Sequence, residues 1–470
     1  MRRGDASARI ASWQARVARR ERAIAERRFN DVRQLANSLL FKYHNAIEKL
    51  PGSTDVRRML ITDALRYLDA LAREASGDPS LQRELATAYL KVGDIQGKPF
   101  AANLGDTAGA LESYRRAQLI LAGLAESAPS NAEALALLSL AYENVGLVLE
   151  RMTDTEQAAE MHRRALDIRE RLRRDNPANA TLRRQIATSY LYLGDALRTA
   201  GTVKTRLGRE GAEEYLLQAG ENYSKALAMR EELAAASPAD TESQRELAQA
   251  LQRAGFTHNS LGAINSEPGD FQLALEYFSR ALKIRQRLLA ADPANAQHRR
   301  RLAGEYQNLG DPQMMLGDAG AALKNYREAL SMFESLASAD ATNAEARRDI
   351  AHTHLRIARA LSQSGEESAA LTHYRRCAQL YEKMIAADPT RFEDRMGIHE
   401  LHLETGALLE RRNETAAAIE SYRQAAAHLA QALEASAQLK MPAHLDDAFR
   451  RRLDETYSLL ATKIKSEGSP

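Results

Sequence analysis

Six side chains in the C-terminal part of the sequence are of types that bind metals or transfer protons. Zinc proteases place two histidines four residues apart on one helix, with a glutamate directly after the first. His399 and His402 are only three residues apart, so the match is partial. His354 and His402 also hold an aromatic position that recurs along the chain, and core packing explains them better than a metal site. The six residues are His352, His354, His399, Glu400, His402 and Glu404.

No other group of residues predicts catalysis. The single cysteine, Cys377, stands where equivalent segments of the chain hold alanine, so we predict a small buried side chain. A disulfide within the chain is impossible with one cysteine. No Ser–His–Asp or Cys–His pairing is supported by the sequence. We therefore predict a non-catalytic protein with no cofactor and no bound metal.

The elements that position these residues are helical hairpins that recur along the chain. Residues 301–330 contain Tyr306 and Gly310 on one amphipathic helix, then Ala322, Tyr326 and Ala329 on a second. Small residues let the two backbones approach, and the aromatic rings fill the space around them. The glycine recurs as Gly93, Gly146, Gly194, Gly255, Gly310, Ala358 and Gly406. The last alanine recurs with an underlying period of 48 residues, as Ala117, Ala165, Ala226, Ala281, Ala329, Cys377 and Ala425.

Residues that cap helix N-termini mark the beginning of each predicted helix, because their side chains accept hydrogen bonds from free backbone N–H groups. The first helices are expected to begin after Asn131, Asn179, Asp240, Asn295 and Asn343. The second helices are expected to begin after Asp106, Asp154, Asp270 and Asp318. Capping residues and hydrophobic period agree, so the sequence predicts an all-α chain.

The recurring pattern of Tyr-x-x-(Leu/Val)-Gly, followed by Ala, an aromatic residue and Ala, resembles the tetratricopeptide repeat (TPR). Good copies are Tyr142/Val145/Gly146/Ala158/Ala165 and Tyr306/Leu309/Gly310/Ala322/Tyr326/Ala329. The resemblance covers roughly residues 79–437. It implies a TPR-like α-solenoid, a right-handed superhelix of antiparallel helical hairpins. The period of 48 residues exceeds the 34 residues typical of the family, which predicts longer helices.

The predicted organisation has four parts. Residues 1–21 are a flexible basic N-terminus, and residues 22–78 form an N-terminal capping helical hairpin. Residues 79–437 hold seven TPR-like repeats, which we number one to seven. Residues 438–470 form a C-terminal capping helix and tail.

Residues 26–54 and 77–97 also resemble the segment that joins the membrane helix to the TPR array in bacterial (Hanks-type) serine/threonine kinases. The Gly-rich loop, His-Arg-Asp and Asp-Phe-Gly motifs of the kinase domain do not occur in this sequence. The resemblance implies the regulatory or ligand-binding region of such a kinase, or a free-standing relative. An accessory domain of an enzyme whose kinase domain lies outside this chain is an alternative.

Charge and hydropathy restrict the classes of partner and compartment. The 65 basic and 63 acidic residues give a net charge of +2, so no nucleic-acid binding is expected from the overall field. Residues 1–33 hold ten arginines against four acidic residues, which leaves open binding of anionic lipid or nucleic acid through a basic N-terminal helix. We predict no transmembrane segment. The compartment would be the cytoplasm for a free-standing protein, or the extracytoplasmic side for a membrane-anchored kinase.

A groove lined by the first helices is one candidate surface for a protein or peptide partner. Asp195, Asp311 and Phe256 in this set suit a partner with some basic and some apolar character. Alternatively, these side chains pack against neighbouring helices. The candidate groove residues are Glu143, Leu147, Asp195, Gln252, Phe256, Gln307, Asp311 and Arg359.

Three insertions between the helices of one hairpin form the second candidate surface. They occupy residues 97–106, 202–211 and 262–269, and we predict loops on one edge of the solenoid. The sequence thus predicts a protein–protein interaction scaffold or sensor, with self-association through the ends of the stack as an open alternative. The candidate loop residues are Lys98, Phe100, Asn103, Lys204, Arg206, Arg209, Asn265 and Glu267.

Overall fold

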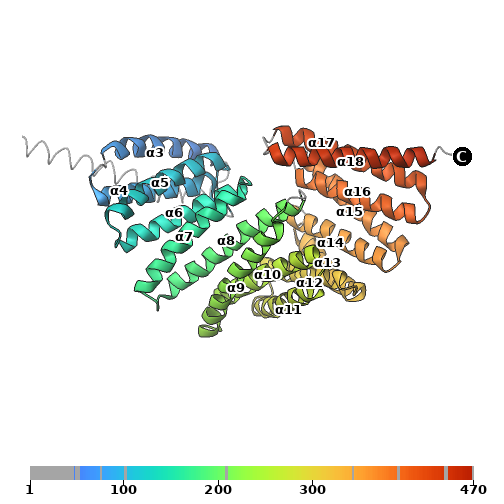
Figure 1. Cartoon of the computed structure of the whole chain (residues 1–470), viewed down its shortest axis with the longest axis horizontal. Helices are drawn as coiled ribbons and strands as arrows, with labels where there is room; N and C mark the ends of the chain where they lie inside the picture. The colour runs from blue at the N-terminus through green and yellow to red at the C-terminus, as the bar shows by residue number, and fades with distance from the viewer. Residues whose placement is uncertain are drawn as a thin grey trace, which may run out of the picture. The chain divides into compact units, whose positions relative to one another are not determined.

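The computed structural model describes residues 47, 53–74, 77–99, 103–206, 210–340, 343–388, 392–438 and 443–467. Within these residues the chain is all-α, as predicted, with sixteen helices and no strand (Figure 1). The helices are α3 (Thr54–Glu74), α4 (Pro79–Gly97), α5 (Thr107–Ser127), α6 (Ala132–Arg151), α7 (Thr155–Asp175), α8 (Ala180–Arg206), α9 (Ala212–Ala236), α10 (Thr241–Asn265), α11 (Pro268–Ala291), α12 (Ala296–Met315), α13 (Ala319–Ala339), α14 (Ala344–Gln363), α15 (Glu367–Ala387), α16 (Phe392–Arg411), α17 (Thr415–Gln438) and α18 (Ala443–Glu467).

The helices pair as antiparallel hairpins, and α4 to α17 supply the first and second helices of repeats one to seven. The chain divides into two compact units, Met1–Leu193 and Gly194–Pro470, with the boundary inside α8. Within each unit, consecutive helices pack side by side (Figure 1). First helices of neighbouring repeats also contact one another, at α4–α6, α10–α12 and α12–α14. We call the surface formed by the first helices within a unit the first-helix face.

The recurring glycine makes room for an aromatic ring from the second helix of its own hairpin. A Cβ atom added to Gly310 would lie 2.3 Å from Cε1 of Tyr326, far inside van der Waals contact. The Tyr326 side chain is 2 % exposed, and its hydroxyl donates to Asp311 at 2.8 Å. The same close approach occurs at Gly93/Tyr114, Gly146/His162, Gly194/Tyr223, Gly255/Phe278 and Gly406/Tyr422. The glycine of the sequence pattern is therefore a packing requirement of the hairpins that carry it.

The N-terminal caps of the first helices follow the prediction. Each predicted residue accepts hydrogen bonds from backbone N–H groups two or three positions later: Asn131, Asn179, Asp240, Asn295 and Asn343. Among the second helices, Asp106, Asp154 and Asp318 cap as expected.

The prediction for Asp270 was wrong. Helix α11 begins two residues earlier, at Pro268, whose fixed φ suits the first helical position. Asp270 then lies in the first turn, and its carboxylate contacts Nδ1 of His258 at 2.7 Å.

Two of the three insertions are helical where loops were predicted. Residues 202–206 continue α8 to Arg206, and residues 262–265 continue α10 to Asn265. Gly201 and Gly262 sit against Leu216 and Phe271 of the partner helix, which lengthens the packed hairpin. The inserted residues thus extend the helices because they continue their buried faces. In the first insertion, the described residues 98–99 and 103–106 are not helical.

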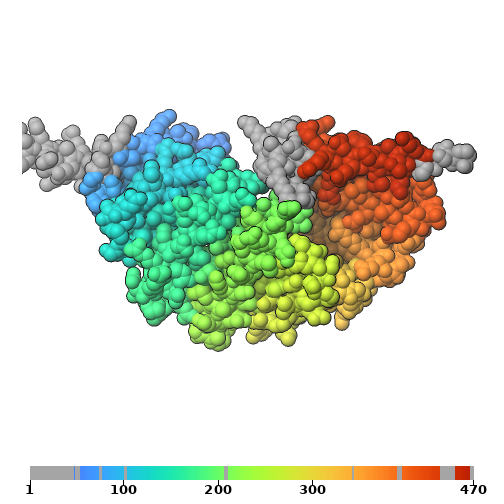
Figure 2. Space-filling model, viewed as in Figure 1, coloured from blue at the N-terminus to red at the C-terminus, as the bar shows by residue number. Residues whose placement is uncertain are grey.

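Helix α3 precedes the repeats and packs on α4, while α18 packs on α17 at the other end of the chain. Figure 2 shows the α16–α18 segment as a continuous packed surface, coloured orange to red. The predicted basic N-terminus and the first capping helix lie outside the described residues, apart from Ile47, and stay predictions.

One described helix, α6, has the length and apolar composition of a membrane span, which the sequence prediction did not anticipate. Its most apolar window has a mean hydropathy of 1.4, and 67 % of that window is buried inside the protein. Leu135, Leu138 and Val148 are among its buried side chains. The apolar run is accordingly used in packing between hairpins.

Candidate functional site

Charged pairs join the first helices of neighbouring repeats in the unit formed by residues 194–470. The residue directly after the recurring glycine of one repeat meets the residue two positions before the glycine, or its alanine substitute, in the next. Asp195 accepts from Arg253 Nε at 2.8 Å, and Asp311 accepts from Arg356 Nε at 2.8 Å. Each aspartate also accepts from a tyrosine hydroxyl of its own hairpin, Tyr223 at 2.7 Å and Tyr326 at 2.8 Å.

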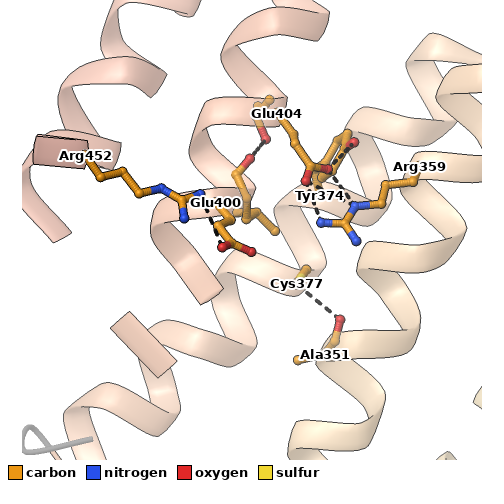
Figure 3. A network of polar contacts seen from close by, with 9 residues as sticks. Ala351, Arg359, Tyr374, Cys377, Glu400, Glu404 and Arg452 are labelled. Carbon is orange, nitrogen blue, oxygen red and sulfur yellow. Dashed lines mark hydrogen bonds and ion pairs between the residues drawn. The ribbon is translucent and has the colours of Figure 1, made fainter. Parts of the chain in front are cut away.

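The pair between repeats six and seven has the opposite polarity. Arg359 replaces the aspartate, and Glu404 replaces the arginine of the next repeat. Arg359 Nη2 donates to Glu404 Oε1 at 2.6 Å, and its Nε donates to Oε2 at 2.9 Å. The Tyr374 hydroxyl donates to Glu404 at 3.1 Å. Figure 3 shows the side chains of Arg359 and Tyr374 pointing toward the Glu404 carboxylate. Burial raises the pKa of Tyr374 far above its ordinary value, and the charge of Glu404 adds to it, so the hydroxyl stays protonated.

An open cavity of about 320 Å³ lies beside this reversed pair. It is formed by α14, α15 and α16, and its size is at the lower end of the range for ligand pockets, roughly 300–1,000 Å³. Arg359 and Glu404 keep 45 % and 30 % of their side-chain surfaces exposed, so both retain surface for an external ligand. The lining residues are Arg359, Ser362, Gln363, Tyr374, Glu404, Ala407 and Arg411.

Arg411 is the second cation of this cavity. Its Nη2 donates to Ser362 at 2.7 Å, and its closest carboxylate, Glu367, is 3.9 Å away. The cavity therefore combines two guanidinium groups, one carboxylate, one amide and two hydroxyls. Such a set can hydrogen bond to the backbone and a polar side chain of an extended peptide.

Most of the predicted groove residues are engaged inside the chain. Leu147 is buried, Gln252 is half-buried, and Phe256 packs edge-on against Phe278 with ring centroids 5.4 Å apart. Asp195 and Asp311 each accept hydrogen bonds from an arginine of the next repeat, and their role in binding a partner stays a prediction. The remaining groove residues bond as follows: Glu143 with Arg169, Asp195 with Tyr223 and Arg253, Gln307 with Thr353, Asp311 with Tyr326 and Arg356, and Arg359 with Glu404.

The predicted loop residues are distributed over helix ends and one loop. Lys98 ends α4, and Asn103 donates to its carbonyl oxygen at 2.8 Å while accepting from Gly105 N–H at 2.7 Å. Lys204 lies in α8 with its amine 5.1 Å from the ring centroid of Tyr215. Of the other positions, Arg206 ends α8, Asn265 ends α10 and donates to Glu213, Glu267 is the N-cap of α11, and Phe100 and Arg209 lie outside the described residues.

The histidines of repeats six and seven pack inside the hairpins, as the sequence analysis favoured. His354 Nδ1 lies 2.9 Å from His373 Nδ1, and the His402 ring stacks on His428 with centroids 5.6 Å apart. His399 is fully buried and bonds to the Ala425 carbonyl oxygen. Within the described residues, no three His, Cys, Asp or Glu side chains are arranged to hold a metal ion.

Cys377 is fully buried, as predicted, and its thiol donates to the Ala351 carbonyl oxygen at 3.1 Å (Figure 3). Burial raises the pKa of this thiol to about 12. A protonated, buried thiol is a poor nucleophile, so this cysteine is a packing residue.

Sequence reasoning missed the partners that complete the site. Arg253, Arg356 and Glu404 all stand two residues before the recurring small residue, so their common register was visible in the sequence. Each of them is opposite in charge to the residue that follows the glycine, or its alanine substitute, in the preceding repeat. This opposite charge was the signal that could have revealed the pairs. Ser362, Gln363 and Arg411 carry no such signal, because only the packing of α14 and α16 brings them together.

No protein-family model matches the chain, and no curated protein matches it. Solved helical-repeat structures do match. The apo form of RapI is 14 % identical over 74 % of this chain and 98 % of that chain, with a TM-score of 0.47. BtubC (BKLC) from P. vanneervenii is 18 % identical over 58 % of this chain and 90 % of that chain, with a TM-score of 0.42.

A third match is a Signal Transduction ATPase with Numerous Domains (STAND) protein from Pyrococcus horikoshii that carries a tetratricopeptide repeat sensor. It is 13 % identical over 87 % of this chain and 54 % of that chain, with a TM-score of 0.41. Likeness at these identities concerns fold alone. The recurring helical hairpins and their glycine–aromatic contacts give the described residues an all-α, TPR-like fold.

Proposed function

We propose that this protein is a non-catalytic interaction module that binds an extended segment of a partner protein on its first-helix face, at the cavity between repeats six and seven. The observation that carries the proposal is the cavity lined by Arg359, Tyr374, Glu404 and Arg411. Along the rest of the described first-helix face of residues 194–470, the charged pairs bond to one another between repeats. Here a similar pair borders an open cavity, with a second arginine that has no carboxylate closer than 3.9 Å.

Filling the cavity should abolish binding without disturbing the fold. Ala407 is exposed within the lining, so Ala407→Trp would place an indole where the partner segment lies. Peptides selected from a displayed random library against the intact chain should bind this variant about tenfold more weakly or worse, as expected when an interface centre is blocked. Isothermal titration calorimetry with the selected peptides measures the change.

Ala416→Trp is the matched control, because Ala416 is an exposed alanine in the first turn of α17, outside the lining residues. This variant should bind the selected peptides as the unmodified chain does. Peptides that bind both variants equally well would place the interaction elsewhere and refute the cavity as the site.

We further propose that the module is the regulatory region of a bacterial serine/threonine kinase or a free-standing relative of one. This finer proposal rests on the sequence resemblance of residues 26–54 and 77–97, of which the second corresponds closely to α4. It predicts that the module changes the phosphorylation rate of a Hanks-type kinase domain from the same source organism. A rate that is unaffected for every such kinase domain would contradict it.

A further inference from the structure

Arg301 on the first-helix face forms no ion pair among the described residues, although the charge of Glu305, one turn further along the same helix, acts on it through space. Arg301 in α12 is half-buried, and its Nε atom is buried without a hydrogen-bond partner among the described residues. A desolvated guanidinium group without an acceptor is costly, and proteins normally supply one. Arg198 in α8 and Arg230 in α9 also have a buried Nε atom without a hydrogen-bond partner, and what distinguishes Arg301 is the set of arginines around it.

Four further arginines surround Arg301, and each of them has a carboxylate of its own. Burial lowers the pKa of Arg301, and the charges of these four neighbours lower it further. The pairs are Arg285 with Glu305 at 2.7 Å, Arg245 with Glu242 at 2.6 Å, Arg300 with Asp349 at 2.6 Å, and Arg253 with Asp195 at 2.8 Å.

The repeat register shows what is unusual at this position. Glu246 in α10, Arg301 in α12 and Asp349 in α14 all stand nine residues before the recurring small residue of their repeats. Glu246 pairs with Arg230 of the preceding repeat, and Asp349 pairs with Arg300. Repeat five holds a cation where its neighbours hold an acid, so the carboxylate that would complete the set is missing from this register.

We propose that Arg301 anchors an oxyanion site between α12 and the preceding repeat, and that its ligand is a carboxylate or phosphate group on an acidic segment of the partner protein. Arginine presents several N–H donors in a planar fork, which suits both groups. This inference rests on the proposed interaction function and deepens it, because it assigns the partner an acidic character.

The test uses the intact chain and three probes: inorganic phosphate, a hexaglutamate peptide, and a phosphoserine peptide of otherwise neutral sequence. Thermal unfolding is followed at constant ionic strength, with chloride replacing the probe, and affinities are measured by calorimetry. Each probe that binds should raise the melting temperature, since binding to the native state alone stabilises it. Comparing the two peptides shows whether carboxylate or phosphate is preferred.

Arg301→Gln should weaken binding of the preferred probe by about tenfold or more, as expected for losing a charge-assisted hydrogen bond. Arg287→Gln is the control, because it removes an equal charge from an exposed arginine on α11 and should leave binding unchanged. Arg301→Glu should raise the melting temperature in the absence of any probe and abolish the response, because it restores the acid that Glu246 and Asp349 supply in neighbouring repeats.

Equal stabilisation of the unmodified chain and Arg301→Gln by the probes would overturn the proposal, as would no stabilisation of the unmodified chain by any of them. If peptides selected on the cavity remain sensitive to Ala407→Trp in that event, the oxyanion site alone is refuted. The interaction function would then stand on the cavity between repeats six and seven.

Discussion

Replacing Gly310 with alanine is expected to lower the free energy of unfolding by about 2 kcal/mol, within the range of about 1–3 kcal/mol for overpacked cores. The added methyl group would lie 2.3 Å from the Tyr326 ring. That ring cannot swing away freely, because it is buried and its hydroxyl is bonded to Asp311. Urea denaturation followed by circular dichroism measures the loss.

Gly304 provides the matched control on the same helix. An added Cβ atom at Gly304 would meet nothing within 4 Å, so Gly304→Ala should stabilise α12 by about 0.5–1 kcal/mol through backbone entropy. The two substitutions are chemically identical and should have opposite signs. Equal effects at both glycines would contradict the packing explanation.

Repeat six shows how the hairpin changes when the glycine is absent. Ala358 stands at the glycine register and is fully buried. Its hairpin tyrosine, Tyr374, donates to Glu404 of the next repeat, whereas Tyr326 donates to Asp311 of its own first helix. A different anchor for the ring thus accompanies the larger residue.

Acidification from pH 6.5 to pH 4 is expected to destabilise repeats six and seven. Burial lowers the pKa of His354 to about 4, with the charges of His373 and Arg376 adding to the effect. Burial likewise lowers the pKa of His402 to about 4, helped by His428 and His399, against Glu420. Both histidines are therefore held neutral in the folded state.

The sign follows from the two pKa values of each histidine. In the unfolded chain, histidine binds its proton near pH 6.5, whereas the folded state resists it until about pH 4. The stabilising contribution is complete above pH 6.5 and is lost as pH falls through this window. The upper bound is about 3 kcal/mol for each histidine, from roughly 1.4 kcal/mol per pKa unit.

Urea denaturation at several pH values measures the total effect, and hydrogen exchange assigns it to α14–α17. Carboxylates also titrate in this range, so the difference between variant and unmodified chain is the deciding quantity. His354→Tyr and His402→Tyr restore the aromatic residue that Tyr306 supplies at the same register in repeat five. These variants should flatten the pH dependence, and an unchanged slope would refute the assignment to the histidine pairs.

The helical fold was predictable because several local signals agreed at each position. Gly310, Tyr326 and Asn295 mark packing and capping that depend mainly on residues within one hairpin. The two errors also concern signals within one hairpin. Asp270 was predicted to cap its helix, but the helix begins before it, at Pro268. Residues 262–265 were predicted to form a loop, but they continue α10, where Gly262 packs against Phe271.

The candidate site was predictable only in part. Arg359 was placed on the correct face, but its pairing with Glu404 depends on a contact between repeats that no single hairpin contains. The charges that act on Arg301 come from four arginines on α10, α11 and α12. Such balances of charge arise from packing across repeats, so a pattern that describes one repeat at a time does not capture them.

The reversal of polarity along the charged pairs limits how this gene can change by recombination. Deleting repeat six would bring Asp311 opposite Glu404, two carboxylates with no cation between them. Duplicating repeat six would bring Arg359 opposite a second Arg356. Either event would be penalised at the new junction, so these hairpins are not interchangeable modules. Their order is encoded in the junctions themselves, and this part of the array should retain its number of repeats as the gene evolves.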